Sequence, residues 1–200
     1  MKLFIVRHGE TDMNVQGLIQ SHSNSQLNNN GKLQAEKIAS RLKNETFNHA
    51  YTSDLERASE TAKIILQYHP EITLLETVKL REKHAGELEG MSKKGAVIKF
   101  NRIRHTFHGF KPKGGESFIE AQQRISAFYE ELIENHKGEH ILLVAHGGII
   151  GALLLYIFDK PIIWKEYNKH RPSNAALTIL EIEDTKKHTI HIMNCIEHLK

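Results

Sequence analysis

The sequence predicts an α/β fold, a single-domain three-layer sandwich with a mainly parallel central sheet and helices on both faces. Two short apolar runs, residues 3–6 and 141–145, are each followed within two residues by a histidine and then by a glycine. Segments with apolar residues at helical spacing alternate with other short, strand-like runs. The 200 residues suffice for one well-cored domain and are few for two, so one domain over residues 1–200 is expected.

The run at residues 3–6 is too short for a helix and is typical of a buried strand. Arg7, His8 and Gly9 follow it. Ligands of open α/β sheets bind in the crevice outside the carboxyl ends of the strands, so this strand should deliver Arg7 and His8 into that crevice. Gly9 has no Cβ, which lets the backbone turn sharply and a ligand approach closely.

The run at residues 141–145 repeats the pattern, because it leads into His146, Gly147 and Gly148. Neighbouring parallel strands lie about 4.8 Å apart. If the two strands are neighbours, His8 and His146 should meet over one site.

Four further strands and four helices complete the predicted fold. The strands are expected at 49–52, 72–75, 175–182 and 189–196, the last two joined by a charged turn near Asp184. The helices are expected at 31–42, from Leu55 onward, at 117–135 and at 149–158.

Several details of these elements can be predicted from local patterns. In the helix at 31–42, Leu33, Ile38 and Leu42 should face inward, with Asn28 or Asn30 near the cap. Ser53 or Asp54 should cap the helix that begins at Leu55. Residues 14–30 form a long polar loop that should cross the site. Residues 91–113 are basic and contain three interleaved phenylalanines, Phe100, Phe107 and Phe110. This segment could form an irregular lid or a helical pair.

Composition argues for an ordinary soluble protein, with 40% apolar and 26% charged residues. A formal charge of +3 with scattered lysines does not favour nucleic acid as a partner. No signal peptide is evident and no stretch approaches the ~20 apolar residues of a membrane span, so a cytoplasmic location without membrane contact is expected. The single cysteine, Cys195, excludes an internal disulfide.

The 14 histidines invite a metal hypothesis that their spacing does not support. The pairs His105/His108 and His188/His191 lack the acidic or thiol neighbours of a zinc site. Gly138 interrupts any helix that would pair His136 with His140. No metal site is therefore expected.

Arg57 lies in the first turn of the helix from Leu55, at the carboxyl end of another strand. The helix macrodipole disfavours a cation there unless an anion is also bound, so this position is a hint of a phosphate. Arg7 and Arg57 both carry forked donors that match a phosphate.

The run Arg7-His8-Gly9-Glu10-Thr11, followed by Asn14, resembles the signature of the histidine phosphatase superfamily, also called the phosphoglycerate mutase-like family. Blocks in the family's order extend the resemblance over nearly the whole chain: residues 53–57 with Thr61, Glu82 with Gly86, Glu89 and Gly90, residues 115–117 and residues 145–148.

The resemblance implies a two-step phosphoryl transfer through a phosphohistidine on His8, with no metal and no other cofactor. It assigns the phosphate contacts to six residues: Arg7, Asn14, Gln20, Arg57, His146 and Gly147. Nearby cations should keep His8 neutral, whereas His146 should be charged beside a phosphate. Glu10 and Thr11 match the signature and are expected to support the site without reacting.

Glu82 matches the family's proton donor. A carboxylate beside a phosphate dianion is disfavoured, so Glu82 should keep its proton and act as a general acid, then as a base toward water. The expected catalytic set is thus His8, Glu82, His146, Arg7 and Arg57.

Three residues of the loop over the site depart from the family pattern: Leu18, where many relatives are basic, Ser21, where glycine is common, and Asn28, where threonine or serine is usual. They leave the substrate open and the catalytic set intact.

A metal-independent phosphatase that acts on a small phosphomonoester is the expected function, because residues 91–115 are short for the insertion of a cofactor-dependent phosphoglycerate mutase. A mutase remains the alternative. A non-catalytic binding module is a third reading, which the presence of His8, Arg57, Glu82 and His146 disfavours. The oligomeric state stays open.

Overall fold

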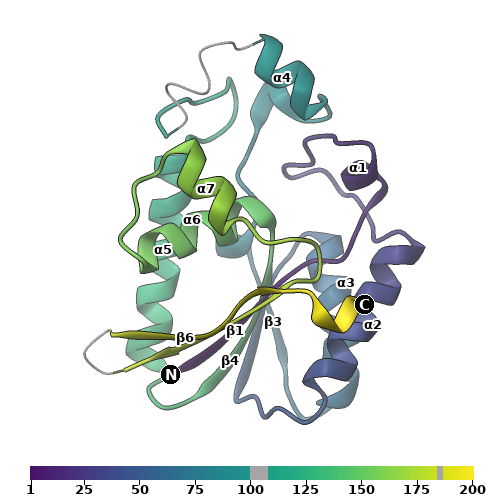
Figure 1. Cartoon of the computed structure of the whole chain (residues 1–200), viewed down its shortest axis with the longest axis vertical. Coiled ribbons are helices and arrows are strands. Elements are labelled where there is room, and N and C mark those ends of the chain that lie inside the picture. Colours follow the sequence, from purple (N-terminus) through teal and green to yellow (C-terminus); the bar gives the residue numbers. More distant parts are fainter. Residues whose placement is uncertain (100–107, 184–186) are drawn as a thin grey trace.

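A six-stranded sheet forms the middle layer of the computed structural model (Figure 1), which describes residues 1–99, 108–183 and 187–200. Its strands are β1 (Lys2–Arg7), β2 (His49–Ser53), β3 (Leu74–Thr77), β4 (His140–Ala145), β5 (Leu177–Ile182) and β6 (His188–Cys195). The order is β3-β2-β4-β1-β5-β6. The first four strands are parallel, whereas β5 and β6 pair antiparallel at one side, so the predicted mainly parallel sheet is confirmed.

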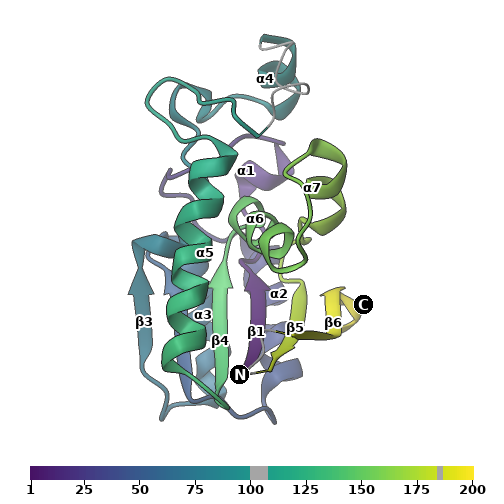
Figure 2. The same cartoon turned by 90° about the vertical axis from the view of Figure 1, so that its left-hand side faces the viewer.

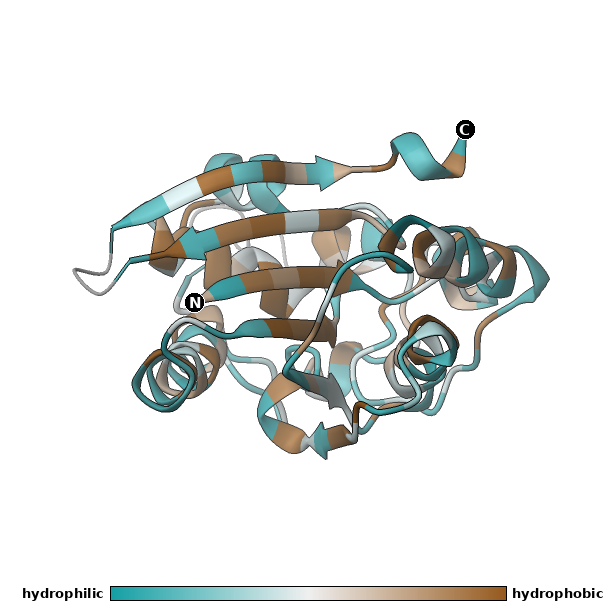
Figure 3. Ribbon diagram, turned by 90° about the horizontal axis from the view of Figure 1, so that it is seen from below, coloured by the Kyte–Doolittle hydropathy of each residue, from teal (hydrophilic) through white to brown (hydrophobic). Residues whose placement is uncertain are grey.

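Helices cover both faces of the sheet, as predicted (Figure 2). The helices are α1 (Asp12–Val15), α2 (Asn29–Leu42), α3 (Glu56–Ile65), α4 (Lys93–Lys99), α5 (Phe118–Asn135), α6 (Gly147–Ile157) and α7 (Trp164–His170). Side chains of a strand alternate between faces, so Phe4 and Val6 pack with α2 and α3, whereas Leu3 and Ile5 pack with α5 and α6. Figure 3 shows the hydrophobic residues concentrated along the central strands between these layers.

The carboxyl ends of the parallel strands point toward the smaller elements α1, α4 and α7, which lie together at one end of the molecule (Figures 1 and 2). Short 3-10 turns complete the chain at Leu66–Tyr68, Val78–Leu80, Gly86–Leu88 and Glu197–Leu199. In the described part of the chain, no helix combines the length and the apolar character needed to cross a membrane.

The structure corrects several helix predictions. Leu33 is 57% exposed, so its predicted inward orientation is wrong; Ala35, Ile38, Ala39 and Leu42 form the buried face. Asn28 caps α2 by accepting from the backbone N–H of Gly31 at 2.8 Å. The next helix begins at Glu56, and its N-cap Leu55 makes no side-chain cap hydrogen bond, so neither Ser53 nor Asp54 is the cap.

The ends of other elements also differ from the predictions. Strand β3 lies at Leu74–Thr77 instead of 72–75, and α6 begins at Gly147, directly after His146. Strand β5 starts at Leu177 because Ala175 has a φ of 51°, outside the range of a strand. The predicted loop at 14–30 is shorter, because α1 ends at Val15 and α2 begins at Asn29, and α7 was not predicted.

Within the segment 91–113, the structure describes α4 (Lys93–Lys99) and the residues from 108 onward. Phe110 is described and packs against a small cluster around Ala85, Leu88 and Ala96. Four residues named above lie outside the described part of the chain: Phe100, His105, Phe107 and Asp184.

Candidate active site

The two strand–histidine junctions meet in the sheet. Strand β1 pairs in parallel with β4, with Arg7 opposite Ala145, which confirms that the two strands are neighbours. The backbone N–H of His8 donates to the carbonyl of Ala145 at 3.0 Å. As a result the rings of His8 and His146 lie 5.2 Å apart between centroids.

His8 is held in one orientation by its own backbone. Its Nδ1 lies 2.6 Å from the carbonyl oxygen of Gly9, so Nδ1–H donates there and Nε2 is left as the ring nitrogen for a ligand. The amide of Asn174 donates to the carbonyls of both His8 and Gly9 at 3.1 Å and fixes this turn. Burial, and then the charges of Arg57 and Arg7, lower the pKa of His8 well below its usual value, so the ring is neutral at pH 7.

Gly9 is required by close packing. A Cβ on Gly9 would overlap the carbonyl oxygen of Gly31 in the first turn of α2. Its backbone N–H donates to Thr61 Oγ1 at 3.1 Å, and Thr61 in turn donates to the carbonyl of Arg57 at 2.7 Å. The turn after β1 is thereby tied to both helices of this face.

Arg7 and Arg57 use part of each guanidinium to bind backbone carbonyls and keep Nε for a ligand. Arg7 uses Nη1 to donate to the carbonyl of Pro172 at 2.8 Å. Arg57 donates from Nη2 to Ser21 O at 2.8 Å and from Nη1 to the carbonyl of Ser23 at 2.9 Å. The Nε atoms of both are buried without a partner in the described structure. Burial lowers the pKa of each guanidinium to about 10, so both stay charged at neutral pH.

His146 is fully buried, with its ring next to that of His8, and is not among the residues that line the cavity. Neither of its ring nitrogens has a hydrogen-bond partner among the described residues. Burial, and then Arg57, lower its pKa well below the usual value, so His146 is neutral in the protein alone. The charge expected from the sequence therefore requires an anion to be bound.

Glu82 is fixed by two backbone donors. Its Oε2 accepts from the N–H of Gly148 and its Oε1 accepts from the N–H of Lys83, both at 2.8 Å. A Cβ on Gly148 would overlap the carboxylate, so the second glycine after His146 makes room for Glu82. Each carboxyl oxygen still has acceptor capacity for a second partner.

Asn14 and Gln20 line the cavity with their amides oriented. Asn14 Oδ1 accepts from the amide of Asn174 at 3.0 Å, and Gln20 Oε1 accepts from Ser25 Oγ at 2.6 Å. Their N–H groups remain for a ligand. Gly147 does not line the cavity; a Cβ there would lie 3.1 Å from Nε of Arg171 and 3.2 Å from Nε of Arg7.

Two of the departures from the family pattern, Leu18 and Ser21, lie in the wall of the cavity. Ser21 has a φ of 51°, a conformation that favours glycine, and its Oγ accepts from the N–H of Ala85 at 2.8 Å. Glu10 lies outside the reacting groups and accepts from the amides of Asn28 and Asn30 at 3.1 and 3.0 Å.

The cavity at this end of the sheet has a volume of about 240 Å³. Five cations and one carboxylate line it: Arg7, Arg57, Lys83, Lys93, Arg171 and Glu82. Apolar and aromatic side chains form much of the remaining wall, among them Leu18, Ile19, Phe110, Phe118 and Trp164. The cavity is therefore suited to a small anion.

Sequence reasoning missed Lys83, Lys93, Arg171 and Asn174. Arg171 Nε is buried without a partner among the described residues, as are the Nε atoms of Arg7 and Arg57. Lys93 comes from α4, and burial lowers the pKa of its ammonium. These residues follow no local pattern, because tertiary folding alone brings their segments over the sheet.

Comparison with known proteins identifies relatives of this chain. The chain is 35% identical over 193 residues to a protein of Arabidopsis thaliana named metal-independent phosphoserine phosphatase, with 92% of this chain and 78% of that protein covered. It is 32% identical over 217 residues to phosphoglycerate mutase-like protein 4 of the same plant, covering 100% of this chain and 87% of that protein. A mycobacterial glucosyl-3-phosphoglycerate phosphatase in complex with VO3 has the same fold, with a TM-score of 0.86, 26% identity, and coverage of 98% and 99%.

These relatives confirm the phosphatase activity expected from the sequence. The family model of the histidine phosphatase superfamily (branch 1) matches residues 3–195, almost the whole chain. The protein therefore belongs to the histidine phosphatase superfamily.

Proposed function

We propose that this phosphatase hydrolyses small phosphomonoesters through a phosphohistidine on His8, without a metal ion. The observation that carries the proposal is the set of buried nitrogens without partners among the described residues, on Arg7, Arg57, Arg171 and His146, around a histidine whose Nε2 is left for a ligand. Unpaired buried donors are rare in folded proteins and cost about 1–3 kcal/mol each, so they indicate a ligand that satisfies them. A phosphate offers the required acceptors.

In the first step, Nε2 of His8 attacks the phosphorus and the bond from phosphorus to the ester oxygen breaks. Glu82 gives its proton to the leaving oxygen, which departs as an alcohol. In the second step, a water attacks the phosphohistidine while Glu82 takes a proton from it, and inorganic phosphate leaves with His8 restored. Arg7, Arg57 and His146 stabilise the charge on the transferring group in both steps.

The preferred substrate carries a carboxylate as well as the phosphate, as phosphoserine does. Lys83 and Lys93 line the same cavity as Arg7, Arg57 and Arg171, and they offer charge for a second anionic group. The relative named as a phosphoserine phosphatase supports this choice. The similarity to phosphoglycerate mutase-like protein 4 makes 3-phosphoglycerate the competing ligand.

A panel of phosphomonoesters tests the proposal, assayed for release of inorganic phosphate in the presence of a chelator. We expect phosphoserine and 3-phosphoglycerate to exceed neutral alkyl phosphates in kcat/KM, and vanadate to inhibit. The mutase reaction is assayed in parallel with 3-phosphoglycerate and bisphosphoglycerate. Isomerisation without phosphate release, or activity that needs an added divalent ion, would overturn the assignment.

The variant His8→Ala tests whether His8 is the phosphoryl acceptor. Rapid quench of the wild type with labelled substrate should trap an acid-labile, base-stable phosphoenzyme, and His8→Ala should form none while it keeps its fold by circular dichroism. Turnover at the wild-type rate in this variant would exclude His8 as the phosphoryl acceptor.

A further inference from the structure

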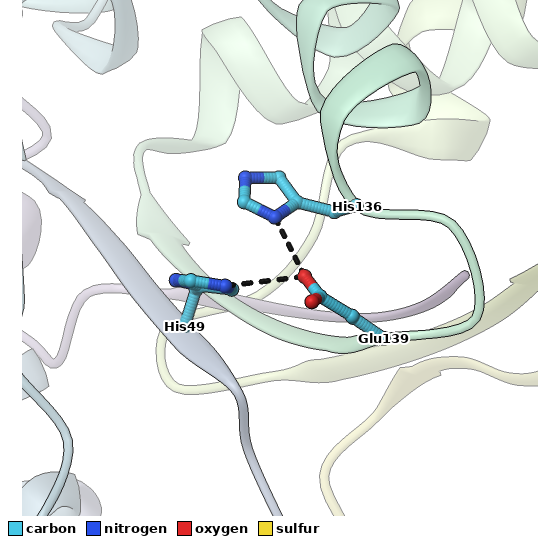
Figure 4. Close-up of side chains that lie close together, drawn as sticks. All are labelled: His49, His136 and Glu139. Atoms are coloured by element: carbon cyan, nitrogen blue, oxygen red, sulfur yellow. Dashed lines mark hydrogen bonds and ion pairs between the residues drawn. The ribbon is translucent and has the colours of Figure 1, made fainter.

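A second cluster of chemically reactive side chains lies at the other end of the sheet. His49 begins β2, His136 follows the last residue of α5, and Glu139 immediately precedes β4 (Figure 4). Glu139 Oε2 lies 3.1 Å from His49 Nε2 and 2.7 Å from His136 Nδ1. The two imidazole rings are 4.3 Å apart between centroids.

The turn between α5 and β4 creates this arrangement. Gly138 has a φ of 73°, which ends the helical direction and turns Glu139 back toward His136. His140 is not paired with His136, as the position of Gly138 predicts, and lies against Thr46. Sequence spacing could not reveal the cluster, because its third member comes from β2, far away in the chain.

We propose that His49, His136 and Glu139 form a binding site for a divalent transition-metal ion, with zinc as the best match. Two imidazole nitrogens and one carboxylate oxygen are ligands that zinc accepts, and all three candidate ligand atoms lie within 4.8 Å of one another. Zinc bonds of 2.0–2.1 Å in a tetrahedron place ligand atoms about 3.3 Å apart. The observed separations of 2.7 and 3.1 Å need only a small opening to admit the ion.

The exposure of the three side chains suits a metal ion. The side chains of His49 and Glu139 are 37% and 36% exposed, which gives an ion access and leaves a fourth position for solvent. His136 is only 12% exposed and is held in place by its surroundings.

Tyr51 completes the site as a positioning residue. Its hydroxyl lies 2.9 Å from Nε2 of His136, on the side of the ring opposite Glu139. When Nδ1 binds the ion, Nε2 carries the proton and donates it to the Tyr51 oxygen, which fixes the ring and its tautomer. Outer partners of this kind typically change metal affinity 10–100-fold.

The site is remote from the phosphatase chemistry. Strand β4 leads from Glu139 to His146 over six residues, which span about 20 Å. A bound ion would link β2, α5 and β4 and stabilise the folded chain, with the active site left unchanged. The inference does not depend on the mechanism proposed for His8.

Titration of chelator-treated protein with zinc, followed by calorimetry and thermal unfolding, tests the proposal. At a zinc concentration about tenfold above Kd, Tm should rise by about 3–6 °C. Cobalt(II) serves as a spectroscopic probe, because a tetrahedral site absorbs visible light far more strongly than the octahedral aquo ion does. His49→Asn should abolish this absorption and weaken zinc binding by more than 100-fold, and Tyr51→Phe should weaken it about 10–100-fold.

His191→Asn is the matched control, because His191 forms a pair with Glu181 at 2.8 Å outside the cluster. This variant should bind zinc as the wild type does. Unfolding in chelator checks that His49→Asn is folded, and phosphatase activity should persist in all three variants. Wild-type zinc affinity in His49→Asn, or no change in wild-type Tm with zinc, would overturn the proposal.

Discussion

Glu82 illustrates at the scale of one residue how the backbone prepares a side chain for chemistry. Two N–H groups, from Lys83 and Gly148, hold the carboxyl group at the edge of the cavity. The sequence predicted its role only through resemblance, since a glutamate between Arg81 and Lys83 reads as a solvated residue. Its environment in the structure distinguishes it from the exposed glutamates.

Glu82→Gln should slow hydrolysis according to the leaving group. An alkyl phosphate leaves as a basic alkoxide that needs a proton, whereas p-nitrophenolate is a weak base. General acid catalysis contributes about 10²–10⁴-fold, so formation of phosphohistidine from an alkyl ester should slow by that factor. Single-turnover measurement on both substrates checks this, with a far smaller loss on the aryl ester. An equal loss on both would assign Glu82 to binding or structure.

Gly148→Ala should displace Glu82 without touching the nucleophile. The new Cβ would overlap the carboxylate, so the side chain must rotate away from the cavity. We expect a loss of about 10²-fold or more in kcat on an alkyl phosphate, because the general acid is misplaced. Gly109→Ala is the control, since a Cβ there meets nothing within 4 Å. Steady-state kinetics of both variants settle the matter, and unchanged kcat in Gly148→Ala would show that this contact is not needed.

At the scale of elements, α5 holds the segment that carries Glu82. Arg124 donates from Nη1 to the carbonyls of Lys79 and Arg81 at 2.8 and 3.0 Å, and from Nη2 to Glu116 at 2.6 Å. The helix itself begins with a capping box between Ser117 and Glu120. One side chain thus connects a well-formed helix to the 3-10 turn Val78–Leu80 and to the loop that follows it.

Arg124→Met should loosen that loop while keeping most of the apolar stem of the side chain. The two carbonyls lose their donor, which should cost about 1–3 kcal/mol of stability and lower Tm by several degrees. We expect kcat on an alkyl phosphate to fall more than on p-nitrophenyl phosphate, with KM less affected. Arg124→Lys should restore part of the loss. Arg41→Met, at an exposed arginine 4.0 Å from Glu45, should change neither Tm nor kcat appreciably.

The sequence predicted elements whose patterns are local and strong. The strands before His8 and His146 and helix α5 were found because apolar runs and helical spacing are visible within one segment. Leu33 was wrongly assigned to the buried face of α2. It precedes Ile38 by five residues, which places the two side chains roughly 140° apart around the helix. Helix α7 was missed since a short segment with mixed polarity gives little periodic signal.

The site was predictable where a motif marks the carboxyl end of a strand. Lys93 and Arg171 reach the cavity from segments that only the folded chain brings over the sheet. The residues of the proposed zinc site are a further example of residues that only the fold brings together, because they lie in β2 and in the turn before β4. Residues that meet through tertiary contacts alone leave no trace in a single sequence.

At the scale of the whole molecule, the active site makes the fold sensitive to acid. Burial keeps His8 and His146 neutral, and both have a pKa well below 6.5 in the folded protein. In the unfolded chain the same histidines titrate near pH 6.5. Below that pH the unfolded chain binds more protons than the folded one, so the free energy of unfolding must fall as the pH falls.

The expected loss is about 1.4 kcal/mol per pH unit for each of the two histidines, beginning near pH 6.5 and continuing toward the lower pKa values of the folded state. Urea unfolding between pH 7.5 and 5.0 measures this slope. The double variant His8→Asn/His146→Asn should lose most of it, whereas His191→Asn, at an exposed position, should keep it. Vanadate should flatten the slope in the wild type, since a bound anion favours the charged form of His146. Equal slopes in the wild type and the double variant would mean that the two buried imidazoles are not neutral, and that the cations of the site are balanced in another way.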